Sequence, residues 1–287
     1  MRFLTSPRRW LAVVALALAT LAGCATLERE QRQWIFRPAK ETWWAGTEAA
    51  AGMTPVWISF ESRESRAPAL LHGLWLPSDD PAAPVLLYLH GARWDVTGSA
   101  ARVRRMGGLG FSVLAIDYRG FGQSTDQSDD ALPSEARAYE DARAAWDWLA
   151  SRYPQQRRYI FGHSLGSAIA VNLATQVNDA SGLIVEGSFT SIPAVFQSMP
   201  WGWLPVTGLI SQRFDAASRI DKVTVPVLVV HGSDDRLISP ELGRALYERA
   251  RPPKRFVLVE GGSHHNTNAL GQSQYGNALR ELFGPAF

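Results

Sequence analysis

Short apolar runs recur along most of the chain, separated by segments in which apolar and polar residues are mixed. Most of the runs lack the strict alternation of a strand with one solvent-exposed face. Continuous apolar runs of this length are typical of strands buried on both faces of a parallel sheet. We therefore expect a mainly parallel, eight-stranded sheet formed by residues 56–60, 70–76, 85–89, 113–116, 159–161, 183–185, 227–230 and 256–259.

Helical patterns lie between these runs. Ser134 can cap a helix that ends before Pro154, and Ser239 with Pro240 starts another. The first helix has one apolar face, formed by Ala138, Ala142, Ala145, Trp146 and Leu149. Alternating strands and helices predict a single α/β domain over residues 55–287, with helices on both sides of the sheet.

One segment interrupts the alternation. Residues 188–222 are rich in aromatic residues and proline but show no strong periodicity. A long insertion of this kind is usually functional or disordered, and this one is too apolar to be disordered. We interpret it as a short cap over a site, whose aromatic residues either line an acyl pocket or pack the cap onto the sheet. The candidates are Phe189, Phe196, Trp201 and Trp203.

The first 23 residues have the pattern of a signal peptide. A basic stretch ending at Arg8 and Arg9 precedes an apolar run over residues 10–21, and small residues follow. This run is too short to span a bilayer. We expect residues 1–23 to be removed and residues 24–54 to form an N-terminal spacer and extension.

The end of this leader, Leu-Ala-Gly followed by Cys24, resembles the lipobox of bacterial lipoproteins. The resemblance implies cleavage before Cys24 and attachment of a diacylglyceryl group to its thiol, which would anchor the protein to a membrane. The alternative is a chance thiol beside an ordinary cleavage site. Ala25 is not the aspartate associated with inner-membrane retention, so an outer-membrane anchor facing the periplasm is favoured over a single-membrane cell surface.

Composition excludes several classes of function. The 287 residues include 29 basic and 27 acidic ones, a near balance that does not indicate a nucleic-acid surface. A single cysteine cannot form an internal disulfide or a Cys-rich zinc site. The sequence lacks H-E-x-x-H, and the turn after residues 85–89 lacks G-x-G-x-x-G, so we expect neither a metal nor a dinucleotide cofactor.

Residues 162–166 form the motif G-x-S-x-G, with Ser164 at its centre. The motif directly follows the run 159–161 and precedes a helix of small residues, which is the context of a nucleophile elbow. A serine at such a bend has a strained backbone, and side chains in place of Gly162 and Gly166 would collide with the turn. Ser164 is therefore a candidate nucleophile. The alternative is a tight turn whose serine only caps the helix.

A serine hydroxyl needs an imidazole to accept its proton. In the chain order Ser, Asp, His known for this elbow, the base follows the acid, which excludes the first three of the six histidines. His231 is better interpreted as the end of a strand that leads to the acid, so His264 and His265 remain. The acid that orients the imidazole is expected after the preceding strand, at Asp234 or Asp235. Within each pair, the pattern leaves both residues open.

Two main-chain amides are candidates for stabilising an oxyanion. The first belongs to Leu165, which follows the nucleophile at the start of a helix. The second is expected from the loop after residues 85–89, where Ala92 is the candidate. Loss of one such donor typically lowers turnover by about 10²–10³-fold.

Taken together, these motifs resemble the serine-hydrolase branch of the α/β-hydrolase superfamily, which has monoacylglycerol-lipase-like, Bem46-like and serine-aminopeptidase-like members. The resemblance covers roughly residues 57–283. It implies that the acid is Asp235, four residues after His231, and that the base is His264, after a glycine-rich turn. It also implies that residues 117–122 brace the site without taking part in chemistry. The motifs that carry it are residues 89–91, 117–124, 162–166, 186–191, 231–235 and 261–264.

The residues and the resemblance predict a serine hydrolase. Ser164 attacks an acyl carbonyl, His264 transfers the proton, Asp235 orients His264, and the amides of Leu165 and Ala92 hold the oxyanion. Water then releases the acyl-enzyme. The aromatic cap and the lipid anchor favour a small-molecule or lipid substrate with an apolar acyl chain on an ester, thioester or lysolipid.

Two other functions compete with this one. A peptidase of the serine-aminopeptidase type shares every motif, and an acidic pocket that binds a substrate amine would favour it. Glu186 is the only acid near the elbow that the sequence offers for this purpose. The other alternative is a non-catalytic envelope module that uses the hydrolase fold as a binding surface.

Overall fold

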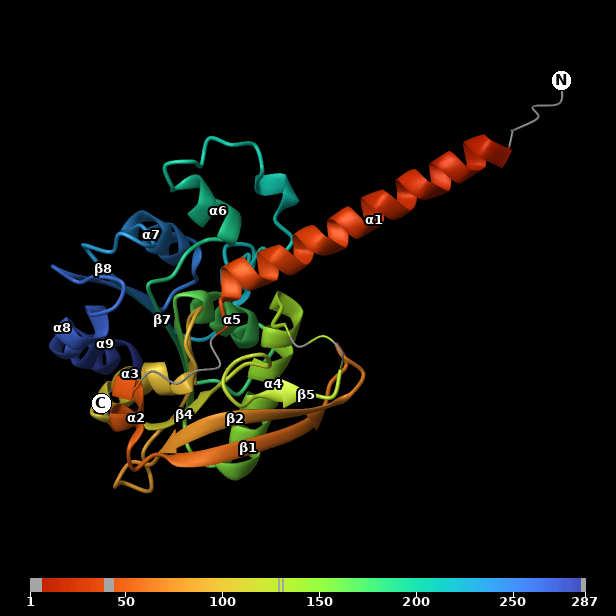
Figure 1. Ribbon diagram of the computed structural model, residues 1–287. Helices are drawn as coiled ribbons and strands as arrows, with labels where there is room; N and C mark the ends of the chain where they lie inside the picture. Colours follow the sequence, from red (N-terminus) through yellow and green to blue (C-terminus); the bar gives the residue numbers. More distant parts are fainter. Residues whose placement is uncertain (1–6, 39–43, 129, 131, 285–287) are drawn as a thin grey trace.

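A mainly parallel sheet forms the centre of the computed structural model, which describes residues 7–38, 44–128, 130 and 132–284 (Figure 1). In these residues the sheet has the strand order β1-β2-β4-β3-β6-β7-β8-β9, with β5 paired to β2 outside this path. Strand β2 is antiparallel to β1, β4 and β5, and the other pairs are parallel. The strands are β1 (Thr54–Glu61), β2 (Pro68–Leu76), β3 (Val85–Leu89), β4 (Ser112–Ile116), β5 (Thr125–Asp126), β6 (Arg158–His163), β7 (Gly182–Glu186), β8 (Val227–Gly232) and β9 (Lys254–Val259).

All eight predicted runs lie within strands, which confirms the expected fold class. The prediction of eight strands was wrong by one, because β5 is a ninth. Strand β5 contains only the polar residues Thr125 and Asp126, so no apolar run marks it in the sequence.

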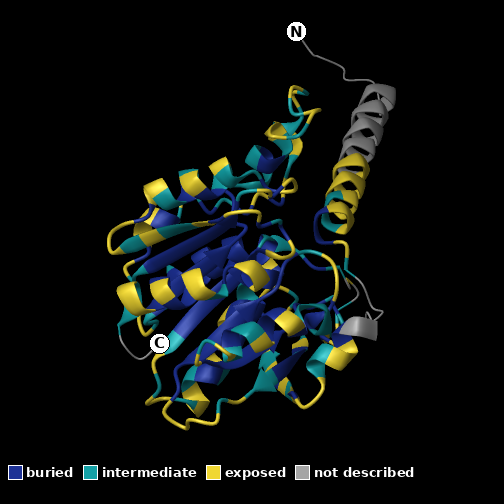
Figure 2. Cartoon of the chain, turned by 90° about the vertical axis from the view of Figure 1, so that its left-hand side faces the viewer, coloured by how far each residue is buried: buried dark blue, intermediate teal, exposed yellow. Residues whose placement is uncertain are grey.

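Helices cover both faces of the sheet. They are α1 (Pro7–Phe36), α2 (Trp44–Ala50), α3 (Ala100–Gly107), α4 (Glu135–Arg152), α5 (Leu165–Ala174), α6 (Ile192–Gln197), α7 (Pro240–Arg249), α8 (Thr267–Leu270) and α9 (Gln272–Phe283). Alternate residues of β3 belong to different cores: Leu87 packs in the cluster that contains α4 and α5, and Leu86 packs in the cluster that contains α3 and α9. The central strands are therefore buried on both sides, as Figure 2 shows, and this accounts for their continuous apolar sequence.

The predicted helix caps agree with the structure. Helix α4 begins after Ser134, whose side chain accepts a hydrogen bond from the amide of Arg137, and it ends at Arg152, before Pro154. Helix α7 begins at Pro240, although Ser239 makes no side-chain cap there.

The N-terminal region, predicted as a spacer and a packed extension, contains a long helix. Helix α1 continues across the expected cleavage position before Cys24, which is exposed, and extends away from the sheet (Figure 1). At its other end, Ile35 and Phe36 are buried in the same core as α4 and α5. The end of α1 is therefore packed against the core of the predicted hydrolase domain. Among the described residues, no helix has the length and apolar character to cross a membrane.

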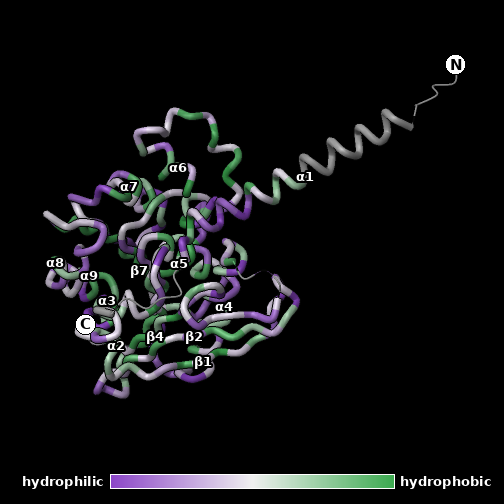
Figure 3. The backbone as a smooth tube through the Cα atoms, viewed as in Figure 1, coloured by the Kyte–Doolittle hydropathy of each residue, from purple (hydrophilic) through white to green (hydrophobic). Residues whose placement is uncertain are grey.

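The cap lies where the sequence predicted an insertion. It contains α6 and two short 3-10 helices, η2 (Thr207–Leu209) and η3 (Ile220–Lys222). Figure 3 shows hydrophobic residues along the loop that leaves α6. Phe214 is fully buried, and its ring lies 5.6 Å from that of Phe36, so part of the cap packs against the end of α1.

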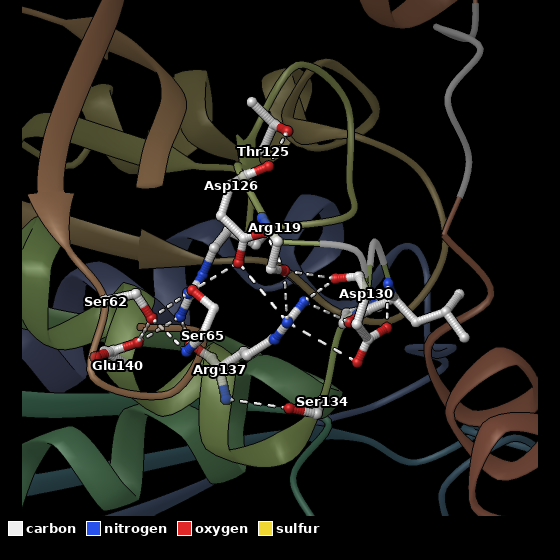
Figure 4. Close-up of polar contacts among 12 residues, drawn as sticks. Ser62, Ser65, Arg119, Thr125, Asp126, Asp130, Ser134, Arg137 and Glu140 are labelled. Carbon is white, nitrogen blue, oxygen red and sulfur yellow. Dashed lines mark hydrogen bonds and ion pairs between the residues drawn. The ribbon is translucent and has the colours of Figure 1, made fainter. Parts of the chain in front are cut away.

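A buried arginine connects the turn after β4 to helix α4 (Figure 4). The Nε atom of Arg119 donates to Asp141 Oδ1 at 2.6 Å, and its two Nη atoms donate to Ser62 Oγ and Glu140 Oε2, each at 2.6 Å. All these contacts lie away from Ser164. They support the interpretation of residues 117–122 as structural.

We expect Arg119→Met to lower the free energy of unfolding by about 3–5 kcal/mol, because it leaves the buried carboxylate of Asp141 without its charged partner. Arg143→Met is the matched control, since the Arg143–Asp147 pair on the same helix is exposed and such pairs contribute about 0–1 kcal/mol. Urea unfolding followed by circular dichroism measures both values. Equal losses in the two variants would contradict the structural importance of Arg119.

Candidate active site

Ser164 lies at a sharp bend between β6 and α5. Its φ of 54° and ψ of −123° lie outside the regions that most residues adopt. A Cβ atom at Gly162 would lie 2.2 Å from the carbonyl oxygen of Gly166, and one at Gly166 would lie 2.1 Å from that of Leu89. Both glycines of the motif are therefore required by close backbone approach, as the sequence predicted.

The side chains of Ser164, His264 and Asp235 form a continuous hydrogen-bonded chain. His264 Nε2 lies 2.9 Å from Ser164 Oγ, and His264 Nδ1 lies 2.7 Å from Asp235 Oδ2. The three residues come from the loops after β6, β9 and β8, which all end at the same edge of the sheet. With Nδ1 donating to the carboxylate, Nε2 is free to accept the serine proton.

The carboxylate of Asp235 is held on both oxygens. Its Oδ1 accepts hydrogen bonds from the amides of Leu237 and Ile238, each at 2.9 Å, and His231 Nε2 lies 3.3 Å from Oδ2. Burial alone would raise the pKa of Asp235, but the hydrogen bonds from His231, His264 and the Ile238 amide outweigh it and hold the pKa well below its ordinary value. Asp235 therefore stays ionised and can stabilise a charged imidazole.

The neighbours Asp234 and His265 do not join this chain. Asp234 is exposed and accepts a hydrogen bond from Ser233 Oγ at 3.0 Å. His265 is also exposed, with its ring centroid 5.5 Å from that of His264. Of the two pairs that the sequence left open, the structure brings Asp235 and His264 to Ser164.

A buried cluster of polar side chains contacts the loop that carries His264. Glu186 is buried and accepts hydrogen bonds from Arg102 Nε, at 2.9 Å, and from the hydroxyl of Tyr275. His163 Nε2 lies 3.1 Å from the carbonyl oxygen of His264. Burial lowers the pKa of His163 far below its ordinary value, and Arg102 adds to this effect, so the imidazole is neutral. This cluster was not predictable from the sequence, because Arg102 and Tyr275 lie on distant helices and belong to no motif.

The two predicted oxyanion donors lie beside the serine. Leu165 is the first residue of α5, where a main-chain amide has no partner within the helix. Ala92 follows β3 and lines the same cavity as Leu165 and Ser164. The next amide, that of Arg93, is already bonded to the carbonyl oxygen of Phe36 at 2.8 Å.

A cavity of about 530 Å³ opens beside Ser164. Its apolar wall comes from the cap, the loop after β8 and the end of α1. These residues are Phe189, Ile192, Val195, Phe196, Met199, Leu237, Ile238, Trp34 and Ile35. Trp34 and Ile35 were not predicted to line the cavity, because the segment that carries them shows no clear period in the sequence.

For two of the four aromatic residues of the cap, the predicted place in an acyl pocket was wrong. Phe189 and Phe196 line the cavity as expected, but Trp201 and Trp203 do not. Their exposed fractions are 65% and 80%. They follow Met199, the last residue of the cap that lines the cavity. Phe189 also packs in the main core, so it serves both functions that the sequence left open.

A mainly parallel sheet with a serine elbow, and an imidazole bonded to that serine, defines the class of α/β hydrolases. Residues 80–216 and 204–269 match the profile of a family described as serine aminopeptidase, S33. The uncharacterized protein MT2364 of Mycobacterium tuberculosis is 32% identical to the chain over 281 residues, which cover 96% of this chain and 95% of that protein. The chain belongs to the serine aminopeptidase, S33, family of α/β hydrolases and is an enzyme of the serine-hydrolase class.

Other relatives are more distant or partial. The protein named lysophosphatidylserine lipase ABHD12 of Danio rerio is 32% identical over 190 residues, or 60% of this chain. The chain spans about half the length of that lipase, 48%. The structure of the Pyrococcus furiosus esterase Pf2001 covers 86% of this chain and 99% of its own, with a TM-score of 0.65 and 19% identity. At that identity, the likeness shows the fold alone.

Proposed function

We propose that this protein is a membrane-anchored carboxylic-ester hydrolase that acts through Ser164, His264 and Asp235. The observation that carries the proposal is the unbroken contact from Ser164 Oγ to His264 Nε2, at 2.9 Å, and from His264 Nδ1 to Asp235, at 2.7 Å. This geometry matches the requirement that the nucleophile, the base and the orienting acid lie within hydrogen-bond reach of one another.

The reaction proceeds in two steps. Ser164 Oγ attacks the ester carbonyl as its proton passes to His264 Nε2, and the amides of Leu165 and Ala92 stabilise the oxyanion. The bond between the carbonyl carbon and the alcohol oxygen then breaks, and His264 returns the proton to the leaving alcohol. In the second step His264 takes a proton from water, the resulting hydroxide attacks the acyl-enzyme, and Ser164 recovers its proton as the acid leaves.

The charges in the cavity favour an ester over an N-terminal peptide. An aminopeptidase binds a cationic substrate amine, for which a carboxylate in the pocket is the natural partner. Among the described residues, no aspartate or glutamate lines the cavity. Glu186, the acid that the sequence offered for this purpose, is buried against Arg102 and Tyr275. The family description keeps the peptidase as the second candidate function.

The apolar wall favours an acyl chain as the part of the substrate bound beneath the cap. Phe196, Val195, Met199 and Leu237 lie together on this wall. Burial of each methylene of a chain contributes about 0.8 kcal/mol. The name of one relative, a lysophosphatidylserine lipase, agrees with an ester substrate of this kind.

Helix α1 supports the proposed membrane anchor. Cys24 is exposed, and Leu27, Gln31 and Trp34 follow it at helical spacing, so the four residues share one face. Gln31 on this face donates to the carbonyl oxygen of Leu209 in the cap at 2.8 Å. Ten residues of helix separate Cys24 from Trp34 in the cavity wall, or about 15 Å. A lipid on Cys24 would anchor the protein in the outer membrane, with the protein facing the periplasm. The anchor would therefore hold the cavity close to the bilayer.

A panel of p-nitrophenyl esters of increasing acyl length, beside aminoacyl p-nitroanilides, tests the choice of reaction. We expect hydrolysis of the esters, with kcat/KM rising from acetate to octanoate, and at least 10²-fold lower values for the anilides. Activity on the anilides alone would replace the proposed function by that of a peptidase. Radiolabelled palmitate incorporation in wild type and Cys24→Ser tests the anchor separately.

A further inference from the structure

The polar side of the cavity carries an excess of positive charge. Four arginines line it, and among the described residues they face no lining aspartate or glutamate. They are Arg37, Arg93, Arg102 and Arg105. Arg102 is neutralised by Glu186, and Arg105 Nε donates to the neutral side-chain oxygen of Asn268 at 2.8 Å. Arg105 keeps its charge but is held by Asn268, whereas neither Arg37 nor Arg93 has a described partner for its guanidinium group.

Arg37 and Arg93 both line the cavity, and their main chains are held close together by a hydrogen bond. The amide of Arg93 donates to the carbonyl oxygen of Phe36, which directly precedes Arg37. Both arginines are exposed, and no described residue pairs with either guanidinium. Both also have a positive φ, 46° for Arg37 and 67° for Arg93, which is uncommon for residues other than glycine. Strained backbone of this kind clusters at functional sites.

Most of the apolar wall and Arg93 come from different parts of the chain, whereas Arg37 follows directly on the end of α1. The apolar wall is formed largely by the cap, and Arg93 is adjacent in sequence to Ala92, the second oxyanion candidate. A substrate whose acyl chain lies beneath the cap and whose carbonyl lies at Ser164 therefore presents its alcohol portion to the arginines. Guanidinium groups bind phosphate and carboxylate oxygens with paired, charge-assisted hydrogen bonds.

We propose that Arg37 and Arg93 form an anion subsite that selects acyl esters whose alcohol portion carries a phosphate or carboxylate group. This inference rests on the proposed ester hydrolysis and adds the class of substrate. Contact with the two arginines keeps the charge of the substrate outside the apolar wall, where water and two guanidinium groups solvate it. A neutral ester gains nothing from this subsite.

Three short-chain substrates with the same octanoyl group, each used below its micellar concentration, test the selectivity. One is neutral, octanoylglycerol, one is octanoylglycerol phosphate, and the third is the octanoyl ester of lactate. We expect kcat/KM of the wild type to be at least about ten-fold higher for an anionic ester than for the neutral one. The phosphate and lactate esters show which anion the subsite prefers.

Arg37→Gln and Arg93→Gln should each lower the ratio of kcat/KM between the anionic and neutral esters toward one, a loss of up to about ten-fold. Arg213→Gln is the matched control, because Arg213 is an exposed arginine of the cap that does not line the cavity. Its ratio should equal that of the wild type. A wild-type ratio near one, or equal ratios in all three variants, would overturn the subsite. A loss that is equal for neutral and anionic esters would show a structural role instead.

Binding of octyl phosphate, measured by calorimetry, separates this inference from the proposed reaction because it needs no turnover. We expect Arg93→Gln to weaken its binding about ten-fold or more, with no such change for octyl glucoside. If the wild type cleaves no ester but binds octyl phosphate through Arg93, the proposed function fails and the subsite stands. If it cleaves neutral esters but octyl phosphate binds equally to all variants, the subsite fails and the function stands.

Discussion

Ser164→Ala is expected to lower kcat for ester hydrolysis by about 10⁶-fold, the loss seen when a triad protease loses its serine. The reason is that no other hydroxyl group is bonded to His264 in the described residues, so the acyl-enzyme cannot form. A small residual rate should persist, because the oxyanion donors and the binding cavity remain. Hydrolysis of p-nitrophenyl octanoate measures the change.

Ser198→Ala is the control for this substitution, since Ser198 is an exposed serine of the cap outside the cavity. It should keep the wild-type rate. Circular dichroism and the thermal midpoint of both variants should match the wild type, because Ser164 fills no part of the core. A Ser164→Ala variant that retains more than about a hundredth of the wild-type kcat would contradict its assignment as the nucleophile.

His264→Ala should cause a loss of similar size, about 10⁶-fold in kcat, because the serine proton then has no acceptor. The adjacent residue provides an internal control. His265→Ala should retain kcat within about ten-fold, since the His265 ring is exposed and bonds to neither Ser164 nor Asp235. Both rates are measured with the same ester at pH 8.

The reverse order of effects would contradict the geometry of the loop after β9. A large loss in His265→Ala with a small loss in His264→Ala would mean that the loop rearranges when substrate binds. Exogenous imidazole offers a further readout, since it should restore part of the activity of His264→Ala. It should have no effect on Ser164→Ala, which retains its base.

The regular part of the fold could be predicted from the sequence because buried strands have a simple signature. Each of β3, β4, β7 and β8 is a short run of apolar residues with no exposed position. Strand β5 has no such run, and its place depends on pairing with β2. The elbow could also be predicted, because both of its glycines are required by close backbone contacts. A side chain at Gly162 would collide with the main chain of Gly166, and one at Gly166 would collide with the end of β3.

Contacts between distant segments were not predictable in the same way. Trp34 and Ile35 line the cavity only because the last turn of α1 packs against the rest of the protein. Nothing in the sequence of α1 indicates where this turn packs. Trp201 and Trp203 are as aromatic as Phe189 and Phe196 but lie outside the cavity. Composition identified the cap, whereas the chain path after α6 decides which of its side chains face the serine.

The choice between adjacent residues needed the resemblance to a family or the structure itself. Asp234 and Asp235 have the same chemistry, and their separation depends on which carboxylate receives the amides of Leu237 and Ile238. The support of the His264 loop by Arg102 and Glu186 involves residues 84 positions apart. No local pattern carries such a contact.

Labelling with a fluorophosphonate probe, followed by mass spectrometry of the modified peptide, tests most directly whether Ser164 is an activated nucleophile. We predict a single phosphonylated residue, Ser164, in the folded wild-type protein, with no labelling of Ser164→Ala and strongly slowed labelling of His264→Ala. A folded wild-type protein that remains unlabelled, or one modified at a different serine, would contradict the mechanism.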